Sequence, residues 1–105
     1  MTVLNVVTHF VKPEKRQQFI SFWQRWVKYV KDNPETCREL KSLKLFTQMY
    51  GGTFGGYVEM WEFDNLEELA KHMAKWASDK GLQAIEKEWS SLSEQATQNL
   101  WIAVG

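Results

Sequence analysis

The residues whose types could perform acid–base chemistry are few, and His72 is the most prominent of them. It lies on the flank of a predicted helix, three residues after Leu69 and four before Trp76. A neutral imidazole at such a position could act as a general base or bind a substrate oxygen, because the ordinary pKa of histidine lies near neutral pH. The alternative interpretation is a half-exposed helix residue without a chemical role.

Asn5 and His9 are two further polar side chains, and they share one face of a predicted strand with Val3, Val7 and Val11. Burying either of them without a hydrogen-bond partner costs about 1–3 kcal/mol. They must therefore have partners in a packed interior or line a cavity, and the sequence leaves both interpretations open. Whether this face meets the helices or a partner subunit also stays open, because a shift of one residue in register exchanges the two faces.

Glu59 raises the same question on another predicted strand, where it shares a face with Tyr57 and Trp61. A carboxylate buried there would have a raised pKa and could serve as an acid or a base. A salt bridge at the edge of the sheet or at a dimer contact is the alternative.

Aromatic residues make up 14% of the chain and include six tryptophans, which could wall a dry pocket for a planar ligand or form ordinary core. We interpret His72 and Asn5 as the candidate catalytic residues. The candidate substrate contacts are His9, Glu59, Trp61 and Trp76. No metal site and no cofactor are expected, since two histidines and one cysteine at wide spacings match no zinc pattern.

The elements that position these side chains follow from the spacing of the apolar residues, which alternate in strands and recur every three to four residues in amphipathic helices. In chain order, the prediction is a strand over 2–11, a helix over 14–32, a short helical piece over 35–40, strands over 43–50 and 57–63, helices over 66–77 and 82–92, and a final strand over 100–104. Asp64 or Asn65 is expected to cap the helix after the third strand. The glycine-rich segment 51–56 predicts a hairpin turn.

This order, β-α-β-β-α-(α)-β, predicts an α+β fold of the ferredoxin-like split βαβ type, with a four-stranded antiparallel sheet and helices on one face. The 105 residues form a single domain, 1–105, in this interpretation. Both faces of the first two strands are apolar, so the face without helices needs a cover. We expect a second copy of the chain to provide it, which gives a homodimer whose sheets meet face to face.

Composition argues against several classes of function. Thirteen basic and thirteen acidic residues give a formal net charge of zero, so nucleic acid is not an expected partner. No apolar run approaches the roughly 20 residues that span a bilayer, so no membrane partner is expected either. The single cysteine, Cys37, and the lack of a signal-peptide pattern fit a cytoplasmic protein.

Three stretches of the chain resemble the dimeric α/β-barrel superfamily, which includes antibiotic-biosynthesis-type monooxygenases, haem-degrading monooxygenases, stress-responsive barrel proteins and NIPSNAP-like proteins. They are HFVKPEKRQQF, YVEMWEFDNLEELAKHM and the terminal strand after a helix that carries a tryptophan. The resemblance covers nearly the whole chain and implies a ferredoxin-like domain that forms a dimeric α/β barrel. It is compatible with functions that range from oxygenation to no known activity.

The first functional interpretation that the resemblance suggests is a cofactor-independent monooxygenase acting on an aromatic or polyketide-like small molecule. Members of that kind oxidise electron-rich aromatic substrates that supply the reducing electrons themselves. The alternative is a non-catalytic ligand-binding or stress-responsive barrel. A cavity of roughly 300 Å³ or more between sheet and helices favours the enzyme, and a packed interior favours the alternative. Haem binding comes third, because Glu86 or a residue near it falls where the family's spacing places the iron-ligating histidine.

Overall fold

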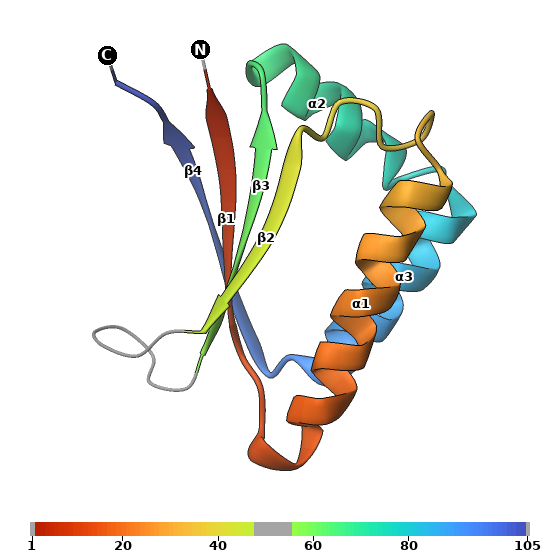
Figure 1. Cartoon of the computed structure of the whole chain (residues 1–105), viewed down its shortest axis with the longest axis vertical. Coiled ribbons are helices and arrows are strands. Elements are labelled where there is room, and N and C mark those ends of the chain that lie inside the picture. The colour runs from red at the N-terminus through yellow and green to blue at the C-terminus, as the bar shows by residue number, and fades with distance from the viewer. Residues whose placement is uncertain (1, 48–55, 105) are drawn as a thin grey trace.

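A computed structural model describes residues 2–47 and 56–104 of the chain. In chain order its elements are β1 (Val3–Phe10), a 3-10 helix (Pro13–Lys15), α1 (Arg16–Asp32), β2 (Ser42–Thr47), β3 (Tyr57–Phe63), α2 (Leu66–Lys75), α3 (Lys80–Leu92) and β4 (Gln95–Ile102). Figure 1 shows these elements as one sheet with the helices beside it. The predicted order of strands and helices is confirmed.

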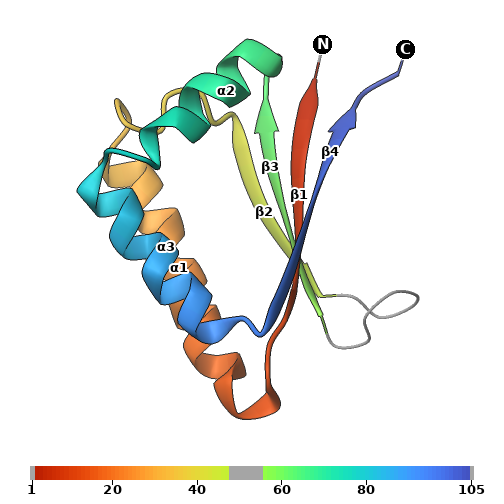
Figure 2. The ribbon, with the colours of Figure 1, turned by 180° about the vertical axis from the view of Figure 1, so that it is seen from behind.

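The four strands form one sheet in the order β2-β3-β1-β4, and all neighbouring strands are antiparallel. The three α-helices lie on one face of this sheet, as the two opposite views agree (Figures 1 and 2). The predicted ferredoxin-like α+β architecture is therefore confirmed. In the register of the sheet, Asn5 is opposite Trp61 and Leu100, and Val7 is opposite Glu59.

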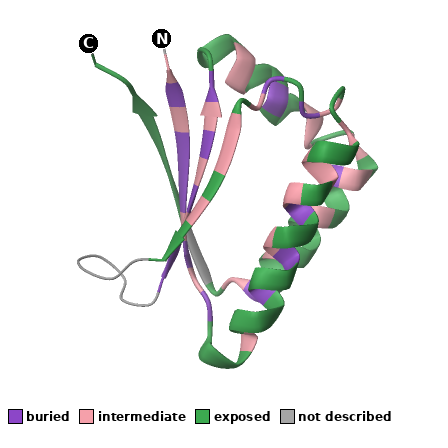
Figure 3. Ribbon diagram, in the orientation of Figure 1, coloured by how far each residue is buried: buried purple, intermediate pink, exposed green. Residues whose placement is uncertain are grey.

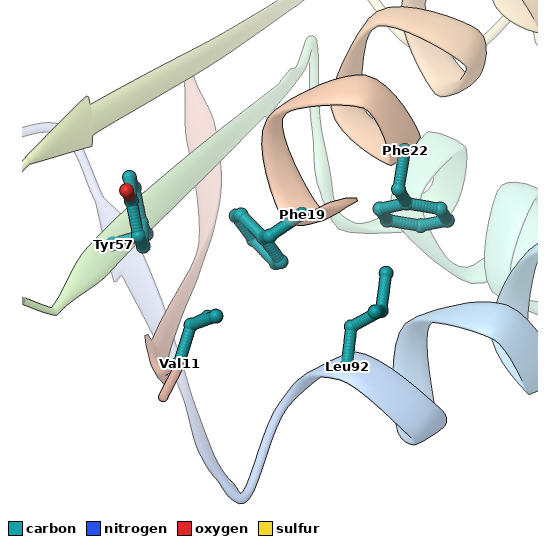
Figure 4. Close-up of a cluster of buried hydrophobic side chains, with 5 residues drawn as sticks. All are labelled: Val11, Phe19, Phe22, Tyr57 and Leu92. Carbon is teal, nitrogen blue, oxygen red and sulfur yellow. The ribbon is translucent and has the colours of Figure 1, made fainter. Parts of the chain in front are cut away.

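The core lies between the sheet and the helices and consists of two groups of buried side chains. The first joins the end of β1, α1, β3 and the end of α3 (Figure 4), and its members are Val11, Phe19, Phe22, Tyr57 and Leu92. The second lies further along α1 and consists of Trp26, Cys37, Trp61, Phe63 and Leu82. Each large side chain removed from water contributes about 1.5–3 kcal/mol, so these groups hold the helices on the sheet.

Side-chain caps explain where α2 and α3 begin. The Asn65 side chain accepts a hydrogen bond from the backbone N–H of Glu68 at 2.9 Å, which confirms it as the N-cap of α2. Asp79 accepts from the backbone N–H of Leu82 at 2.9 Å and caps α3. The Asn65 cap thus begins α2 directly after β3, and the Asp79 cap begins α3 after the short turn that follows α2.

Two predicted elements differ from the structure. The final strand, predicted over 100–104, is β4 over Gln95–Ile102, because the polar residues 95–99 pair their backbone with β1 although they show no apolar alternation. The helical piece predicted over 35–40 is a series of turns. Asn33, just before this segment, donates from its side chain to the Tyr29 carbonyl at 2.9 Å and so closes the end of α1.

The other boundaries agree closely, apart from a first turn of 3-10 helix before α1. Positions 48–50 of the second predicted strand and 51–55 of the predicted hairpin turn lie outside the described residues. No helix in the described part of the chain is long and apolar enough to cross a membrane.

The face of the sheet opposite the helices carries large apolar side chains. Trp101 lies opposite Leu4 in the register and is 49% exposed, and Phe46 lies opposite Val58 and is 46% exposed. Val6, at the centre of this face, is buried by its neighbours on the sheet. The helices do not reach this face of the sheet, as Figures 1 and 2 show.

Candidate functional site

Asn5 lies in a pocket between the sheet and α2. The pocket has a volume of about 230 Å³, and its lining consists of Asn5, Leu69, Met73, Gln98, Asn99 and Leu100. Asn5 is only 8% exposed, and no group of residues 2–47 and 56–104 hydrogen-bonds its side-chain amide. A nearly buried amide without a protein partner is suited to bind a polar atom of a ligand, because leaving it unsatisfied costs free energy.

This pocket, which we call the Asn5 pocket, exists because the helices do not cover β4. Leu100 and Ile102 point to the same side of the sheet as Asn5 and Val3, their partners in the register, yet they are 49% and 45% exposed. Figure 3 shows β1 mostly buried and β4 exposed beside it. The uncovered strip of sheet next to α2 is therefore open to a ligand of modest size.

His9 and Glu59 form a buried pair on the neighbouring strands β1 and β3. His9 is completely buried and Glu59 is 2% exposed. Nε2 of His9 contacts Oε2 of Glu59, and the indole N–H of Trp61 donates to Oε1 of the same carboxylate at 3.2 Å. The carboxylate thus has one donor at each oxygen, which compensates for its removal from water.

The other nitrogen of His9 faces α3. Nδ1 lies 3.2 Å from Oγ of Ser93, and the indole N–H of Trp89 points at the ring, with its nitrogen 2.8 Å from Nδ1 and 3.1 Å from Nε2. An indole N–H only donates, so Nδ1 accepts from Trp89 and Nε2 carries the hydrogen toward Glu59. The Nδ1 lone pair therefore faces the end of α3, where the Trp89 N–H and the Ser93 hydroxyl both lie within hydrogen-bond distance.

A second pocket opens beside that lone pair. Its volume is about 200 Å³, and Glu86, Trp89, Ser90 and Ser93 line it. We call it the Ser93 pocket. Ser93 is the C-cap of α3, and the neighbouring Glu94 N–H donates to the Phe10 carbonyl at 3.0 Å, which ties this corner to the end of β1.

His72 lies in the core, beneath α2 and away from both pockets. It is completely buried, with ring centroids 5.9 Å from Trp61 and 5.3 Å from Phe63. The indole N–H of Trp76 donates to Nε2 at 3.2 Å, while Nδ1 has no hydrogen-bond partner among the described residues. Burial lowers the pKa of His72 to about 4, although the Glu39 carboxylate, 3.8 Å from Nδ1, opposes the shift.

Glu39 belongs to a buried ion pair that fastens the turn after α1 to α2. It is 2% exposed, and Nζ of Lys75 donates to both of its oxygens at 2.9 Å and to the Thr36 carbonyl at 3.0 Å. Burial acts to raise the pKa of Glu39, but the Lys75 hydrogen bonds and charge outweigh it and hold that pKa below its usual range. The charges of Glu39 and Lys75 are paired with each other, so we interpret this cluster as part of the packing of the fold and not as part of a site.

The predicted site residues separate into three places, one of which is the hydrogen-bonded pair of His72 and Trp76 in the core. Asn5 lies in a pocket, and His9, Glu59 and Trp61 form one hydrogen-bonded chain in the interior. His72 is not among the residues that line the Asn5 pocket, although Leu69 and Met73 of the same helix are. The pKa of His72 lies below the ordinary histidine value because the side chain is buried in the core.

The predicted aromatic wall is mainly core. Trp61 and Trp76 stack with ring centroids 5.8 Å apart, and Trp26 packs 5.6 Å from Trp61 and 5.5 Å from Trp76. Trp89, which sequence reasoning did not select as a site residue, lines a pocket instead.

Sequence reasoning also missed Ser93, Glu39 and Lys75. Ser93 meets a histidine 84 positions earlier in the chain, and Lys75 meets a carboxylate 36 positions earlier. No local sequence motif predicts contacts between residues so far apart in the chain. One indication of such contacts was present in the sequence. Asn5 and His9 are polar side chains on a valine-rich strand face, so they needed partners from elsewhere in the chain.

The volumes of the cavities help to distinguish an enzyme from a non-catalytic ligand-binding barrel. The Asn5 pocket and the Ser93 pocket, at about 230 and 200 Å³, are each below the 300 Å³ expected of an enzyme site. A hollow of about 320 Å³ lies between α1 and α3 rather than against the sheet. The described residues contain no group of three or more histidine, cysteine, aspartate or glutamate side chains that could hold a metal ion.

Comparison with known proteins identifies the fold. No family model and no curated protein sequence matches the chain, but many solved structures do. A NIPSNAP family protein from Agrobacterium tumefaciens superposes with a TM-score of 0.74 at 16% identity, over 99% of this chain and 94% of its own. SnoaB, a cofactor-independent oxygenase from Streptomyces nogalater, gives a TM-score of 0.71 at 16% identity, over 97% and 92% of the two chains.

A dimeric protein of unknown function with a ferredoxin-like fold from Bacteroides fragilis gives a TM-score of 0.64 at 14% identity, over 95% and 94% of the chains. The chain has a ferredoxin-like fold, which it shares with these solved structures. Identities of this size establish the fold and not the activity. The ferredoxin-like fold is shared by an oxygenase and by proteins without a known role, so function must be argued from the site.

Proposed function

We propose that this protein is a homodimeric barrel that oxygenates a small, electron-rich aromatic compound in the Asn5 pocket without a cofactor. The observation that carries the proposal is the Asn5 amide, nearly buried, without a protein partner and facing an apolar pocket. The structural similarity to a cofactor-independent oxygenase supports it. We also propose a cytoplasmic location, because a free thiol such as that of Cys37 persists in a reducing compartment.

The homodimer is argued from the face of the sheet opposite the helices. A monomer would leave Trp101 on β4 and Phe46 on β2 each nearly half exposed on this face. Two copies meeting through this face would bury it, and one structurally similar protein is described as dimeric. Trp101→Asp and Phe46→Asp are expected to give a monomer in analytical ultracentrifugation. An unchanged dimer in both variants would contradict this face as the interface.

The role proposed for Asn5 is to hold the ionised oxygen of the substrate. Its amide N–H can donate to a phenolate or enolate oxygen, and Leu69, Met73 and Leu100 supply apolar contacts for the rings. A hydrogen bond to a charged oxygen is stronger than one to a neutral oxygen, so the amide favours the anion that reacts with dioxygen. In this arrangement the substrate anion supplies the electrons and the pocket keeps it oriented and dry.

The chemistry balances without an added reductant. For an anthrone, the ring-bound methylene loses a proton to give the enolate, and the enolate carbon forms a bond to dioxygen. The hydroperoxide that results loses water, so that anthrone and dioxygen become anthraquinone and water. The carbon is oxidised, one oxygen atom enters the product and the other leaves in water.

Oxygen uptake with anthrone as the probe tests this proposal. Asn5→Ala is expected to lower kcat/KM by about 10- to 100-fold, the loss of one hydrogen bond to a charged group. Asn5→Asp should lower it at least as far, because a carboxylate repels the substrate anion. The matched control is Gln24→Ala, which removes an exposed amide from α1, and it should behave like the unaltered protein.

Equal activity in all four proteins would contradict a role for Asn5. Absence of anthrone oxidation in the unaltered protein, above the rate in buffer, would contradict oxygenation of this substrate class.

A non-catalytic ligand-binding barrel is the second candidate, and the cavity volumes favour it. Neither pocket against the sheet reaches 300 Å³, and His72 is held in the core. Under this alternative, anthrone binds and quenches tryptophan fluorescence but is not consumed. Fluorescence titration beside the oxygen measurement therefore separates the two candidates.

A further inference from the structure

We propose that Ser93, His9 and Glu59 form a second active site, in which Ser93 is the nucleophile of an acyl-transfer reaction on small esters. This site is distinct from the Asn5 pocket and does not depend on the function proposed there. Four residues along β1 separate Asn5 from His9, which corresponds to about 13 Å. The two proposals therefore concern different side chains and different pockets.

The three groups stand in the order that nucleophilic catalysis requires. Oγ of Ser93 lies 3.2 Å from Nδ1 of His9, and Nε2 on the far side of the ring contacts the Glu59 carboxylate. A nucleophile within reach of a base, which a third group orients, is the geometric signature of such a site. The three residues come from α3, β1 and β3, so the fold and not a local motif brings them together.

The surroundings fix the base in the required form. Glu59 is itself held by the Trp61 indole N–H at 3.2 Å, and Phe19 packs against the His9 ring with centroids 5.3 Å apart. With the hydrogen on Nε2, the Nδ1 lone pair faces the Ser93 hydroxyl. It can take the serine proton once the Trp89 N–H, which donates to Nδ1 in the resting state, turns to the substrate. The C-terminal end of α3, which ends at Ser93, carries a partial negative charge that favours the imidazolium formed in that step.

The pocket supplies the place for the ester. Ser93 lines the Ser93 pocket together with Glu86, Trp89 and Ser90, so its side chain borders a cavity although His9 does not. In the resting state the Trp89 N–H points at the His9 ring. When Nδ1 takes the serine proton, the Trp89 N–H loses its acceptor. The Trp89 N–H and the Ser90 hydroxyl can then donate to the ester carbonyl oxygen, which acquires negative charge in the reaction.

The reaction proceeds in two balanced halves. In the first, Oγ of Ser93 bonds to the carbonyl carbon, its proton passes to Nδ1 of His9, and the bond from that carbon to the alkoxy oxygen breaks as the alcohol leaves with the proton. In the second, a water oxygen bonds to the acyl carbon while His9 takes its proton, the bond from that carbon to Oγ of Ser93 breaks, and His9 returns the proton to Oγ as the acid leaves. Ester and water become acid and alcohol.

Charge at the mouth of the pocket selects the ester. The Glu86 carboxylate lines the opening, and the Trp89 indole forms one wall. An anionic ester is repelled by Glu86, whereas neutral and cationic esters are accepted. Small aryl or cationic esters are therefore the substrate class that this site fits.

Hydrolysis of p-nitrophenyl acetate by the full-length chain tests the proposal. Stopped-flow absorbance should show a burst of nitrophenolate, and intact-mass and peptide mapping should place one acetyl group on Ser93. Ser93→Ala should lower the enzymatic rate by at least about 100-fold, and Glu59→Gln, which keeps the shape but not the charge, by at least about tenfold. Glu86→Gln should raise the rate with p-nitrophenyl hemisuccinate relative to the acetate.

Ser91→Ala is the matched control. Ser91 is an exposed serine on the same helix whose hydroxyl donates to the Glu88 carbonyl at 2.6 Å, and its loss should leave hydrolysis unchanged. Melting curves of each variant confirm folding before rates are compared. Hydrolysis that is equal in Ser93→Ala and the unaltered chain, or an acetyl group that maps only to lysines, would overturn the proposal.

Discussion

The buried His72 makes a quantitative prediction for stability against pH. Its pKa is about 4 in the folded protein because burial disfavours the imidazolium, against 6.5 for the exposed side chain. Between these values the unfolded chain binds a proton that the folded chain does not, so stability falls as pH decreases from 6.5 toward 4. The full difference corresponds to about 3 kcal/mol, and about 2 kcal/mol of it should be lost between pH 7 and pH 4.5.

The variant that isolates this effect is His72→Gln. A glutamine carbonyl can still accept the Trp76 indole N–H, which is now 3.2 Å from Nε2 of the imidazole, but it does not titrate. Urea unfolding of both proteins at fixed concentration, from pH 7 to pH 4.5, gives the free energy of unfolding of each. The difference between them should shift by about 2 kcal/mol in favour of the variant as the pH falls.

Parallel curves for the two proteins over this range would refute the reasoning. They would mean that His72 takes up its proton in the folded state at an ordinary pKa, and so that it is open to water. That result would restore His72 as a candidate base for the Asn5 pocket.

Three other expectations follow from the packing. Lys75→Met leaves the Glu39 carboxylate buried without its partner, and urea unfolding at pH 7 should show a loss of about 3 kcal/mol. Cys37 is 3% exposed and burial raises its pKa to about 11, so Ellman's reagent at pH 8 should label it only after denaturant unfolds the chain. Gly81→Ala places a Cβ atom against the end of the Tyr29 ring, which must shift from its hydrogen bond to Asp79, so thermal melting should show a lower Tm.

Local patterns were sufficient to predict most of the fold. The apolar stripe of α1 and the alternation in β3 each matched one element, because each buries a single face against one neighbour. The beginning of β4 could not be found in this way. Residues 97–99 are polar and exposed, and backbone pairing with β1 holds them in the sheet.

The site was only partly accessible from the sequence. Asn5 and His9 were singled out because polar side chains on an apolar strand face need partners, and the structure shows that both face the helices. What surrounds each one depends on contacts from distant segments, such as Ser93 at the end of α3. The burial of His72 depends on how α2 rotates against β3, which a flank position in a helical stripe does not determine.

Native mass spectrometry with anthrone measures the central claim, a homodimer that holds a small aromatic molecule at Asn5. The account predicts a particle of two 12.4 kDa chains that retains anthrone, and an Asn5→Ala dimer that loses it at the same concentration. A monomer, or a dimer that binds anthrone equally with and without the Asn5 amide, would contradict it.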